Sequence, residues 1–154
     1  MFRGKYKHHL DEKGRVALPN KFREILRVKY GSEVLIVTNF PDYLVVYPLE
    51  EWKKIEEKLL KLPWDIPQIR QYIRYFWGAA EECYPDRQGR LLIPQSLREE
   101  MKLEKEIVLV GMLNHFEIWN PKVLEKEFKE TKENFGQLWK QVSSFLNGDK
   151  NTLS

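Results

Sequence analysis

The chain has 154 residues, 42% of them hydrophobic and 13% aromatic, which suits one compact domain or two very small ones and excludes an intrinsically disordered chain. A single cysteine, Cys83, excludes an intrachain disulfide and a multi-cysteine zinc cluster. No apolar run reaches the roughly 18 residues that cross a bilayer, and the polar N-terminus lacks the apolar stretch of a secretion signal, so we expect a cytoplasmic protein without membrane contact.

The net charge of +3 is unevenly distributed along the sequence. Residues 1–48 hold nine Lys and Arg against five Asp and Glu, whereas residues 81–121 hold five against eight. Potentials act through such local patches. An anionic partner is therefore expected to meet the N-terminal third of the chain.

Residues 2–10 alternate between two kinds of side chain, which predicts a strand with two different faces. The less polar face consists of Phe2, Gly4, Tyr6, His8 and Leu10. The other face, which we call the basic row, consists of Arg3, Lys5, Lys7 and His9. Cations at alternate positions of a strand suit the phosphates of a nucleic-acid strand.

A tight turn is predicted at residues 11–14, where the sequence is Asp-x-x-Gly. The Asp11 side chain can bond backbone amides, and Gly14 can take a positive φ. Lys13 and Arg15 continue the basic row around this turn. A short apolar strand then leads to a proline that suits the first turn of a brief helix, which carries Lys21 and Arg23.

A hairpin is predicted from residues 34–37 and 43–47, with a turn at 39–42. A helix over 49–62 follows, because apolar residues recur there at helical spacing. Residues 63–67 contain two prolines and interrupt this helix, and a short helical piece over 68–75 comes next.

The same series of elements then occurs a second time. Residues 11–23 (DEKGRVALPNKFR) return as residues 86–98 (DRQGRLLIPQSLR), with five identical positions at a spacing of 75. Residues 34–37 match 107–110 at a spacing of 73. The second copy also predicts strands at 77–84 and 116–119 and helices at 122–135 and 137–146.

The duplication divides the chain into a first repeat (1–62), a linker with a short helix (63–75), a second repeat with C-terminal helices (76–146) and a flexible tail (147–154). One repeat has about four short strands and a helix, too few to bury much surface alone. We therefore predict an α+β, mainly β fold in which two tandem repeats intertwine into one pseudo-two-fold barrel with flanking helices.

With its two Asp-x-x-Gly-Arg motifs (11–15 and 86–90) and its opening Met1-Phe2-Arg3-Gly4, the chain resembles the MraZ family of bacterial transcriptional regulators from residue 1 to about 140. The resemblance implies a swapped-hairpin barrel like that of AbrB-type DNA-binding domains, with both halves from one chain. It also implies a nucleoid-associated, ring-shaped homo-oligomer. Such a ring would bind direct repeats in the promoter of the division and cell-wall gene cluster and repress it.

The predicted DNA contacts are the basic residues of the first repeat: Arg3, Lys5, Lys7, His9, Lys13, Arg15, Lys21 and Arg23. The second repeat is an internal control, since its counterparts of the basic row are Gly78, Ala80, Glu82 and Tyr84. We therefore expect the first repeat to contact DNA and the second to complete the barrel or a subunit interface.

The turn residues themselves are predicted to be structural: Asp11, Gly14, Asp86, Gly89 and Arg90. Arg90 is expected to pair with Asp86, because the guanidinium fork suits a carboxylate. For Arg15, contact with a base or a phosphate is the preferred interpretation over the same kind of ion pair.

No metal, cofactor, small-molecule substrate or catalytic group is expected. His8 and His9 are adjacent on one strand and point to opposite faces, which suits a shared metal poorly. Two alternatives stay open. One is a protein-interaction module such as an AbrB-like antitoxin, and the other is a metal-dependent nuclease that uses the turn carboxylates.

Overall fold

The computed structural model describes residues 1–148. The chain forms two compact units, Met1–Pro121 and the segment from Lys122 onward, and each is described by itself. The tail predicted at 147–154 falls almost wholly outside the described residues.

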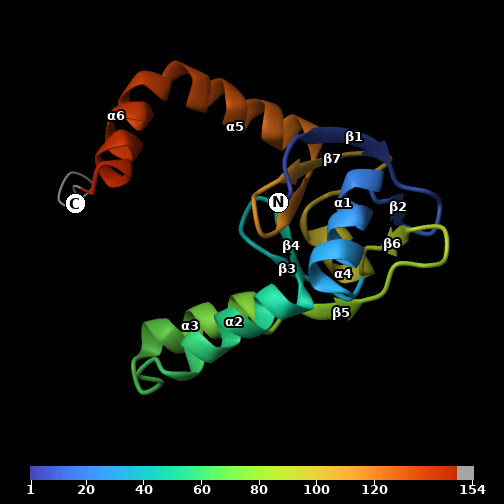
Figure 1. Ribbon diagram of the computed structural model, residues 1–154, viewed down its shortest axis with the longest axis horizontal. Helices are drawn as coiled ribbons and strands as arrows, with labels where there is room; N and C mark the ends of the chain where they lie inside the picture. The colour runs from blue at the N-terminus through green and yellow to red at the C-terminus, as the bar shows by residue number, and fades with distance from the viewer. Residues whose placement is uncertain (149–154) are drawn as a thin grey trace. The chain divides into compact units, whose positions relative to one another are not determined.

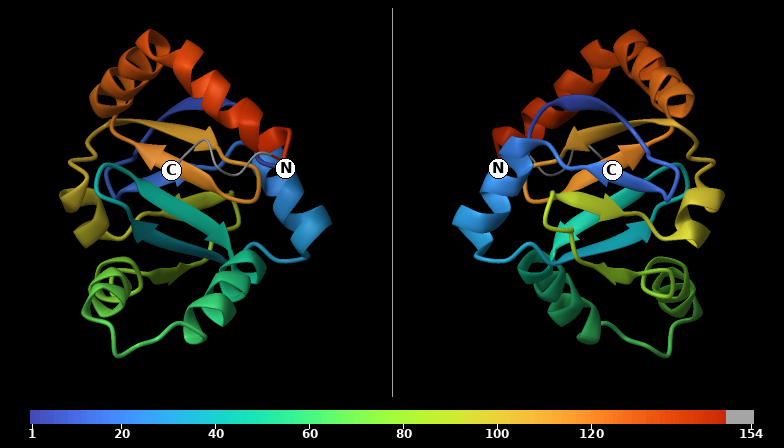
Figure 2. Two further views of the ribbon diagram at one scale, coloured as in Figure 1. Left: turned by 90° about the vertical axis from the view of Figure 1, so that its left-hand side faces the viewer. Right: turned by 90° about the vertical axis from the view of Figure 1, so that its right-hand side faces the viewer.

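All strands among the described residues belong to the first unit and pair antiparallel (Figures 1 and 2). A six-stranded sheet has the order β1-β7-β8-β4-β3-β5, and β2 pairs with β6 in a separate two-stranded sheet. The bounds are β1 Lys5–His9, β2 Arg15–Ala17, β3 Leu35–Asn39, β4 Leu44–Pro48, β5 Glu81–Cys83, β6 Arg90–Leu92, β7 Glu106–Gly111 and β8 Phe116–Trp119.

The two repeats are interleaved. The first strand of each repeat pairs with the other repeat, β1 with β7 and β5 with β3, and the hairpins meet where β4 pairs with β8. The sheets are nevertheless not closed into one barrel, so that part of the expectation is not confirmed. The β2–β6 ribbon is three residues long on each side and lies in its own sheet, so it does not continue the six-stranded ladder.

Six α-helices accompany the strands among the described residues: α1 Asn20–Ile25, α2 Leu49–Leu60, α3 Pro67–Phe76, α4 Gln95–Glu100, α5 Pro121–Glu133 and α6 Phe135–Leu146. Pro19, Pro48 and Pro94 directly precede α1, α2 and α4 as N-caps, where a missing N–H costs nothing. A π-helical turn, η1 (Leu26–Tyr30), follows α1 and ends at Gly31. This turn was not predicted from the sequence.

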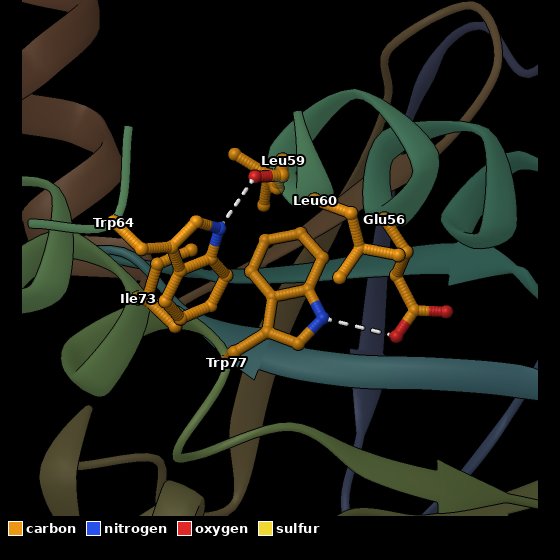
Figure 3. Close-up of a pocket in the computed structure, with 6 residues that line it drawn as sticks. All are labelled: Glu56, Leu59, Leu60, Trp64, Ile73 and Trp77. Carbon is orange, nitrogen blue, oxygen red and sulfur yellow. Dashed lines mark hydrogen bonds between the residues drawn. The ribbon is translucent and has the colours of Figure 1, made fainter. Parts of the chain in front are cut away.

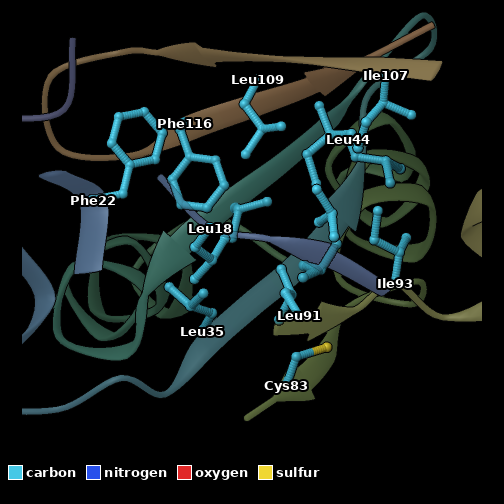
Figure 4. Close-up of a cluster of buried hydrophobic side chains, with 14 of the residues drawn as sticks. Leu18, Phe22, Leu35, Leu44, Cys83, Leu91, Ile93, Ile107, Leu109 and Phe116 are labelled. Carbon is cyan, nitrogen blue, oxygen red and sulfur yellow. The ribbon is translucent and has the colours of Figure 1, made fainter. Parts of the chain in front are cut away.

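The main core contains corresponding residues of both repeats (Figure 4). Val16 and Leu91 face each other in the β2–β6 ribbon, and both are fully buried. The Phe22 ring packs against the rings of Phe2 and Phe116, with centroids 5.1 and 5.0 Å away. Each such side chain stabilises the fold by about 1.5–3 kcal/mol through burial.

The register of the hairpins corrects the predicted match between the repeats. Leu35 and Val37 point into the main core, and so do Ile107 and Leu109. The structural spacing in these strands is therefore 72, and the predicted spacing of 73 is wrong by one residue. An offset of one residue would exchange the two faces of the strand. The extra length of the first repeat lies in the stretch that contains η1.

A second apolar cluster joins α2 and α3 to the sheet. Ile36 and Val45 pack with Trp52 of α2 and Phe76 of α3, and the hydroxyl of the buried Thr38 donates a hydrogen bond to the Phe76 carbonyl. The two helices thus form a hairpin fixed to β3 and β4, the lower green pair in Figure 1. The predicted strand over 77–84 is shorter than expected, because α3 runs to Phe76 and β5 begins only at Glu81.

Candidate nucleic-acid interface

The basic row lies on an edge strand of the six-stranded sheet. Lys5, Lys7 and His9 are exposed, and they alternate with the half-buried Tyr6 and His8. Arg3, which precedes β1, is also exposed. At its end, His9 Nε2 is 3.7 Å from Glu106 Oε1, and both side chains are more than 60% exposed. The side chains of the row therefore face solvent.

The turn after β1 is fixed by its aspartate. Asp11 Oδ1 accepts hydrogen bonds from the backbone N–H groups of Lys13 and Arg15, both at 2.9 Å, and Oδ2 accepts from Arg15 Nε at 2.6 Å. The bond from the Arg15 backbone is the main cause that lowers the Asp11 pKa to about 2. Gly14 has a φ of +84°, which an L side chain rarely adopts. The turn presents Lys13 to solvent, while Arg15 is held by Asp11.

The turn of the second repeat has the same geometry. Asp86 Oδ1 accepts from the N–H groups of Gln88 and Arg90, and Oδ2 accepts from Arg90 Nε at 2.8 Å. Gly89 has a φ of +76°. These hydrogen bonds lower the Asp86 pKa, and the bond from the Arg90 backbone N–H makes the largest contribution. The Asp-to-Arg pair is therefore a feature of the turn itself and occurs with or without a basic row.

The two predicted contacts on α1 differ in their surroundings. Lys21 is exposed. Arg23 is largely buried, lies against Gly89 of the second repeat and pairs with Glu33 at 3.4 Å. The exposed residues among the predicted contacts are thus Arg3, Lys5, Lys7, His9, Lys13 and Lys21, while Arg15 and Arg23 are half-buried and pair with Asp11 and Glu33.

The opposite edge of the sheet is acidic. β5 carries the exposed Glu81 and Glu82, and the Tyr84 hydroxyl donates a hydrogen bond to Glu82 Oε2 at 2.7 Å. In Figure 1, β1 runs above the other labelled strands and β5 lies below them. One sheet therefore ends in cations at one edge and in carboxylates at the other.

The Cys83 thiol and the His8 imidazole, which could in principle act as a nucleophile or a metal ligand, are partly or fully buried in the fold. Burial raises the pKa of the Cys83 thiol to about 11, so the thiol is protonated at neutral pH, and burial lowers the pKa of His8. Within residues 1–148, no three His, Cys, Asp or Glu side chains come together in a way that could hold a metal ion. The same residues contain no helix long and apolar enough to span a membrane.

An apolar groove lies between α2 and α3 (Figure 3). Its volume is about 240 Å³, and it is lined by Glu56, Leu59, Leu60, Trp64, Ile73 and Trp77. The two indole N–H groups donate to the Leu59 carbonyl and to Glu56 Oε2, both at 3.1 Å. With one carboxylate and no cation in its lining, the groove does not suit an anionic ligand.

Two residue groups were not found from the sequence. Arg98 of α4 lies against Gly14, as Arg23 lies against Gly89; the signal for this was the Arg shared at positions 23 and 98 of the repeats. Glu51 is buried and accepts hydrogen bonds from Tyr30, Lys54 and Asn114. Burial alone would raise the Glu51 pKa, but these bonds together lower it. No sequence signal marks Glu51 among the acids of α2.

Comparison with known proteins identifies the family. The family described as "MraZ protein, putative antitoxin-like" matches residues 1–72 and 76–142. The chain belongs to the MraZ family. The two segments of this chain that match the MraZ family correspond to the two interleaved repeats of the structure.

Relatives in the MraZ family cover almost the whole chain. The protein named "Transcriptional regulator MraZ" of Syntrophobacter fumaroxidans is 43% identical over 137 residues, 89% of this chain and 91% of the relative. Proteins of the same name from Caldanaerobacter subterraneus subsp. tengcongensis and Pediococcus pentosaceus are each 41% identical over 145 residues, 94% of this chain and 99% of the relative.

Proposed function

We propose that this chain is a transcriptional regulator that binds double-stranded DNA through the basic row and the turn that follows it. The observation that carries the proposal is the exposed line of cations on β1, at a place where the matching strand of the second repeat exposes carboxylates. The name of its relatives, transcriptional regulator, supports the same conclusion.

The geometry of β1 suits a phosphate backbone. Alternate residues of a strand lie about 6.6–6.8 Å apart on one face, so the side chains of Lys5 and Lys7 form a regular line with that of His9. Lysines bound to phosphates give affinity that falls steeply with salt. They carry no sequence information by themselves.

Sequence choice in this proposal comes from Arg15. Asp11 binds Arg15 Nε and so fixes the plane of the guanidinium at the tip of the turn. The remaining guanidinium nitrogens then donate to the O6 and N7 atoms of a guanine. Arg23 is left out of the proposed interface, because Glu33 and Gly89 enclose it.

The small size of the DNA-binding surface on one subunit is the reason for proposing an oligomer. A single row of cations binds weakly, whereas several identical subunits on regularly spaced direct repeats gain affinity by avidity. We propose a ring-shaped homo-oligomer on the protein's own promoter, at the head of a division and cell-wall gene cluster, where occupancy blocks transcription. The exchange of β1 and β5 between the repeats supports an AbrB-like swapped-hairpin arrangement of each subunit, with its two sheets left unclosed.

The decisive experiment reverses two charges of the basic row. The variant Lys5→Glu/Lys7→Glu is compared with Lys53→Glu/Lys58→Glu, which changes the net charge equally on the exposed side of α2. Binding to DNA from upstream of the gene is measured by fluorescence anisotropy over a range of salt concentrations, with the oligomer checked by light scattering. We expect the affinity of the first variant to fall roughly a hundredfold or more and that of the second to change little. Equal affinities of the two variants would contradict the proposal.

A second candidate function is a protein-interaction module of the antitoxin kind. The observation that favours it is α6, none of whose residues is buried and which exposes Phe135, Trp139, Val142 and Leu146. A salt titration separates the two functions, because only phosphate neutralisation gives a steep linear dependence of log affinity on log salt.

A further inference from the structure

Each repeat holds the turn of the other repeat with an arginine. The guanidinium of Arg98, on α4, lies so close to Gly14 that a Cβ atom at position 14 would clash with Arg98 Cζ. Arg98 Nε donates to the carbonyl of Ile93 at 2.9 Å, and the Ile93 N–H donates to the Gly14 carbonyl at 3.0 Å. The guanidinium of the second repeat is thereby fixed against the turn of the first.

The reciprocal contact has the same design. A Cβ atom at Gly89 would clash with Arg23 Nε, and the Leu18 N–H donates to the Gly89 carbonyl at 3.0 Å. Arg23 differs in one respect, since its Nε pairs with Glu33 instead of a carbonyl. The molecule therefore contains two matched arginine–glycine contacts, one behind each turn.

We propose that Arg98 is a positioning residue for DNA recognition: from the second repeat, it fixes the turn that presents Lys13 and Arg15 of the first. This inference depends on the proposed function. It also gives the second repeat, whose edge is acidic, a part in DNA recognition. Arg23 holds the other turn, which carries no basic row before it, and has no such part.

Arg98 acts in this proposal by pre-organising the turn. Asp11 fixes the turn from within through three hydrogen bonds. The ends of the turn are tied to the rest of the fold by the bond from the Leu10 N–H to the Lys105 carbonyl and by the pairing of β2 with β6. The segment at Gly14 is held by the Gly14–Ile93 bond and by Arg98, which fills the space that a side chain at position 14 would need. Without Arg98 this segment is less well ordered before binding, and the ordering that binding then requires weakens affinity.

The test compares Arg98→Ala with Arg23→Ala, the matched removal from the other turn. DNA affinity and its salt dependence are measured for both, together with amide hydrogen exchange at Gly14 and Gly89. We expect Arg98→Ala to weaken DNA binding roughly five- to twentyfold and to reduce the salt slope by about one for each phosphate that the turn no longer neutralises. Exchange should quicken at Gly14. Arg23→Ala should quicken exchange at Gly89 and leave affinity within about twofold.

A purely structural effect of Arg98→Ala would change the melting temperature but not the salt slope of the folded fraction. If Arg98→Ala does not fold, Arg98→Lys keeps the charge but lacks the planar group, and it should show the same weaker binding and faster exchange at Gly14 to a smaller extent. An equal weakening of affinity in the two alanine variants, or an unchanged affinity in Arg98→Ala, overturns the inference. In the latter case, a Lys5→Glu/Lys7→Glu variant that no longer binds shows that the proposed function stands while the role of Arg98 does not.

Discussion

The two edges of the six-stranded sheet have the same construction and opposite charge. β1 and β5 are the first strands of their repeats, and each pairs with the inner hairpin of the other repeat. At matched positions Lys7 faces solvent on β1 and Glu82 faces solvent on β5. The inward positions of these two strands also differ, since Tyr6 and His8 are matched by Glu81 and Cys83. Apolar character is shared instead in the ribbon and the core, where Val16 is matched by Leu91.

This comparison shows which parts of the duplication serve the fold and which serve binding. The aspartate–arginine turns and the arginines behind them occur in both repeats, so they are needed for the architecture. The basic row occurs once. A binding function that resides in it should be lost without damage to the fold, and the fold should be damaged equally from either repeat.

The largest expected effect tests whether a core truncation in either repeat destabilises the whole fold. Phe22 and Leu97 occupy matched core positions and are 0% and 3% exposed. Truncation leaves a cavity, so Phe22→Ala should lower the free energy of unfolding by about 3–5 kcal/mol and Leu97→Ala by about 2–5 kcal/mol. Urea denaturation monitored by tryptophan fluorescence measures both. Destabilisation by only one of the two variants would mean that the halves do not share a core.

A smaller effect tests whether DNA affinity depends on where the positive charges lie or only on the net charge of the protein. The exchange Lys7→Glu/Glu82→Lys moves one cation from β1 to the matched position of β5 and leaves the net charge at +3. One phosphate contact becomes a repulsion, so DNA affinity should fall roughly ten- to a hundredfold, with a lower salt slope. Both sites are exposed, so the melting temperature should hardly change. Retained affinity would assign binding to net charge.

The smallest effect concerns the stability of the two turns at low pH, which should change in the same direction in both repeats. The Asp11 pKa lies at about 2 in the folded chain against 3.8 for the free side chain, and the Asp86 pKa is lowered in the same direction. A lowered folded pKa gives stabilisation that is complete above the unfolded pKa and is lost as the pH falls toward the folded pKa. The Asp11 turn should therefore loosen between about pH 4 and pH 2, and the Asp86 turn should loosen as the pH falls below 3.8. Carboxyl carbon shifts in NMR titrations would report this, and Asp11→Asn and Asp86→Asn should each remove it at one turn.

Much of the architecture could be predicted from the sequence, because the repeat shows each element twice. The hairpins, the prolines before the helices and the alternation of β1 all follow from local patterns that the structure reproduces. Which residue of the first hairpin corresponds to which residue of the second could not be found in this way. Residues 34–37 and 107–110 are all apolar, so no polar residue marks which ones point inward, and only the core contacts distinguish a spacing of 72 from 73.

The limits at the interface have a similar cause. Alternation placed the basic row on the exposed face, but nothing in the sequence separates Lys21, which is exposed, from Arg23, which reaches across to the other repeat. That contact depends on two chain segments brought together by folding. The π-helical turn is likewise set by the packing of Leu26 and Tyr30 against the core and not by a local signal.

The exchange of strands also sets an order of events during synthesis. Lys5 pairs opposite Val110, so the first strand to leave the ribosome has no hydrogen-bonding partner until the second repeat has been made. At about 5–20 residues per second, this wait lasts several seconds. The strand that waits is rich in lysine, a residue that discourages pairing between exposed strand edges, so we expect its charge to limit aggregation of the unfinished polypeptide.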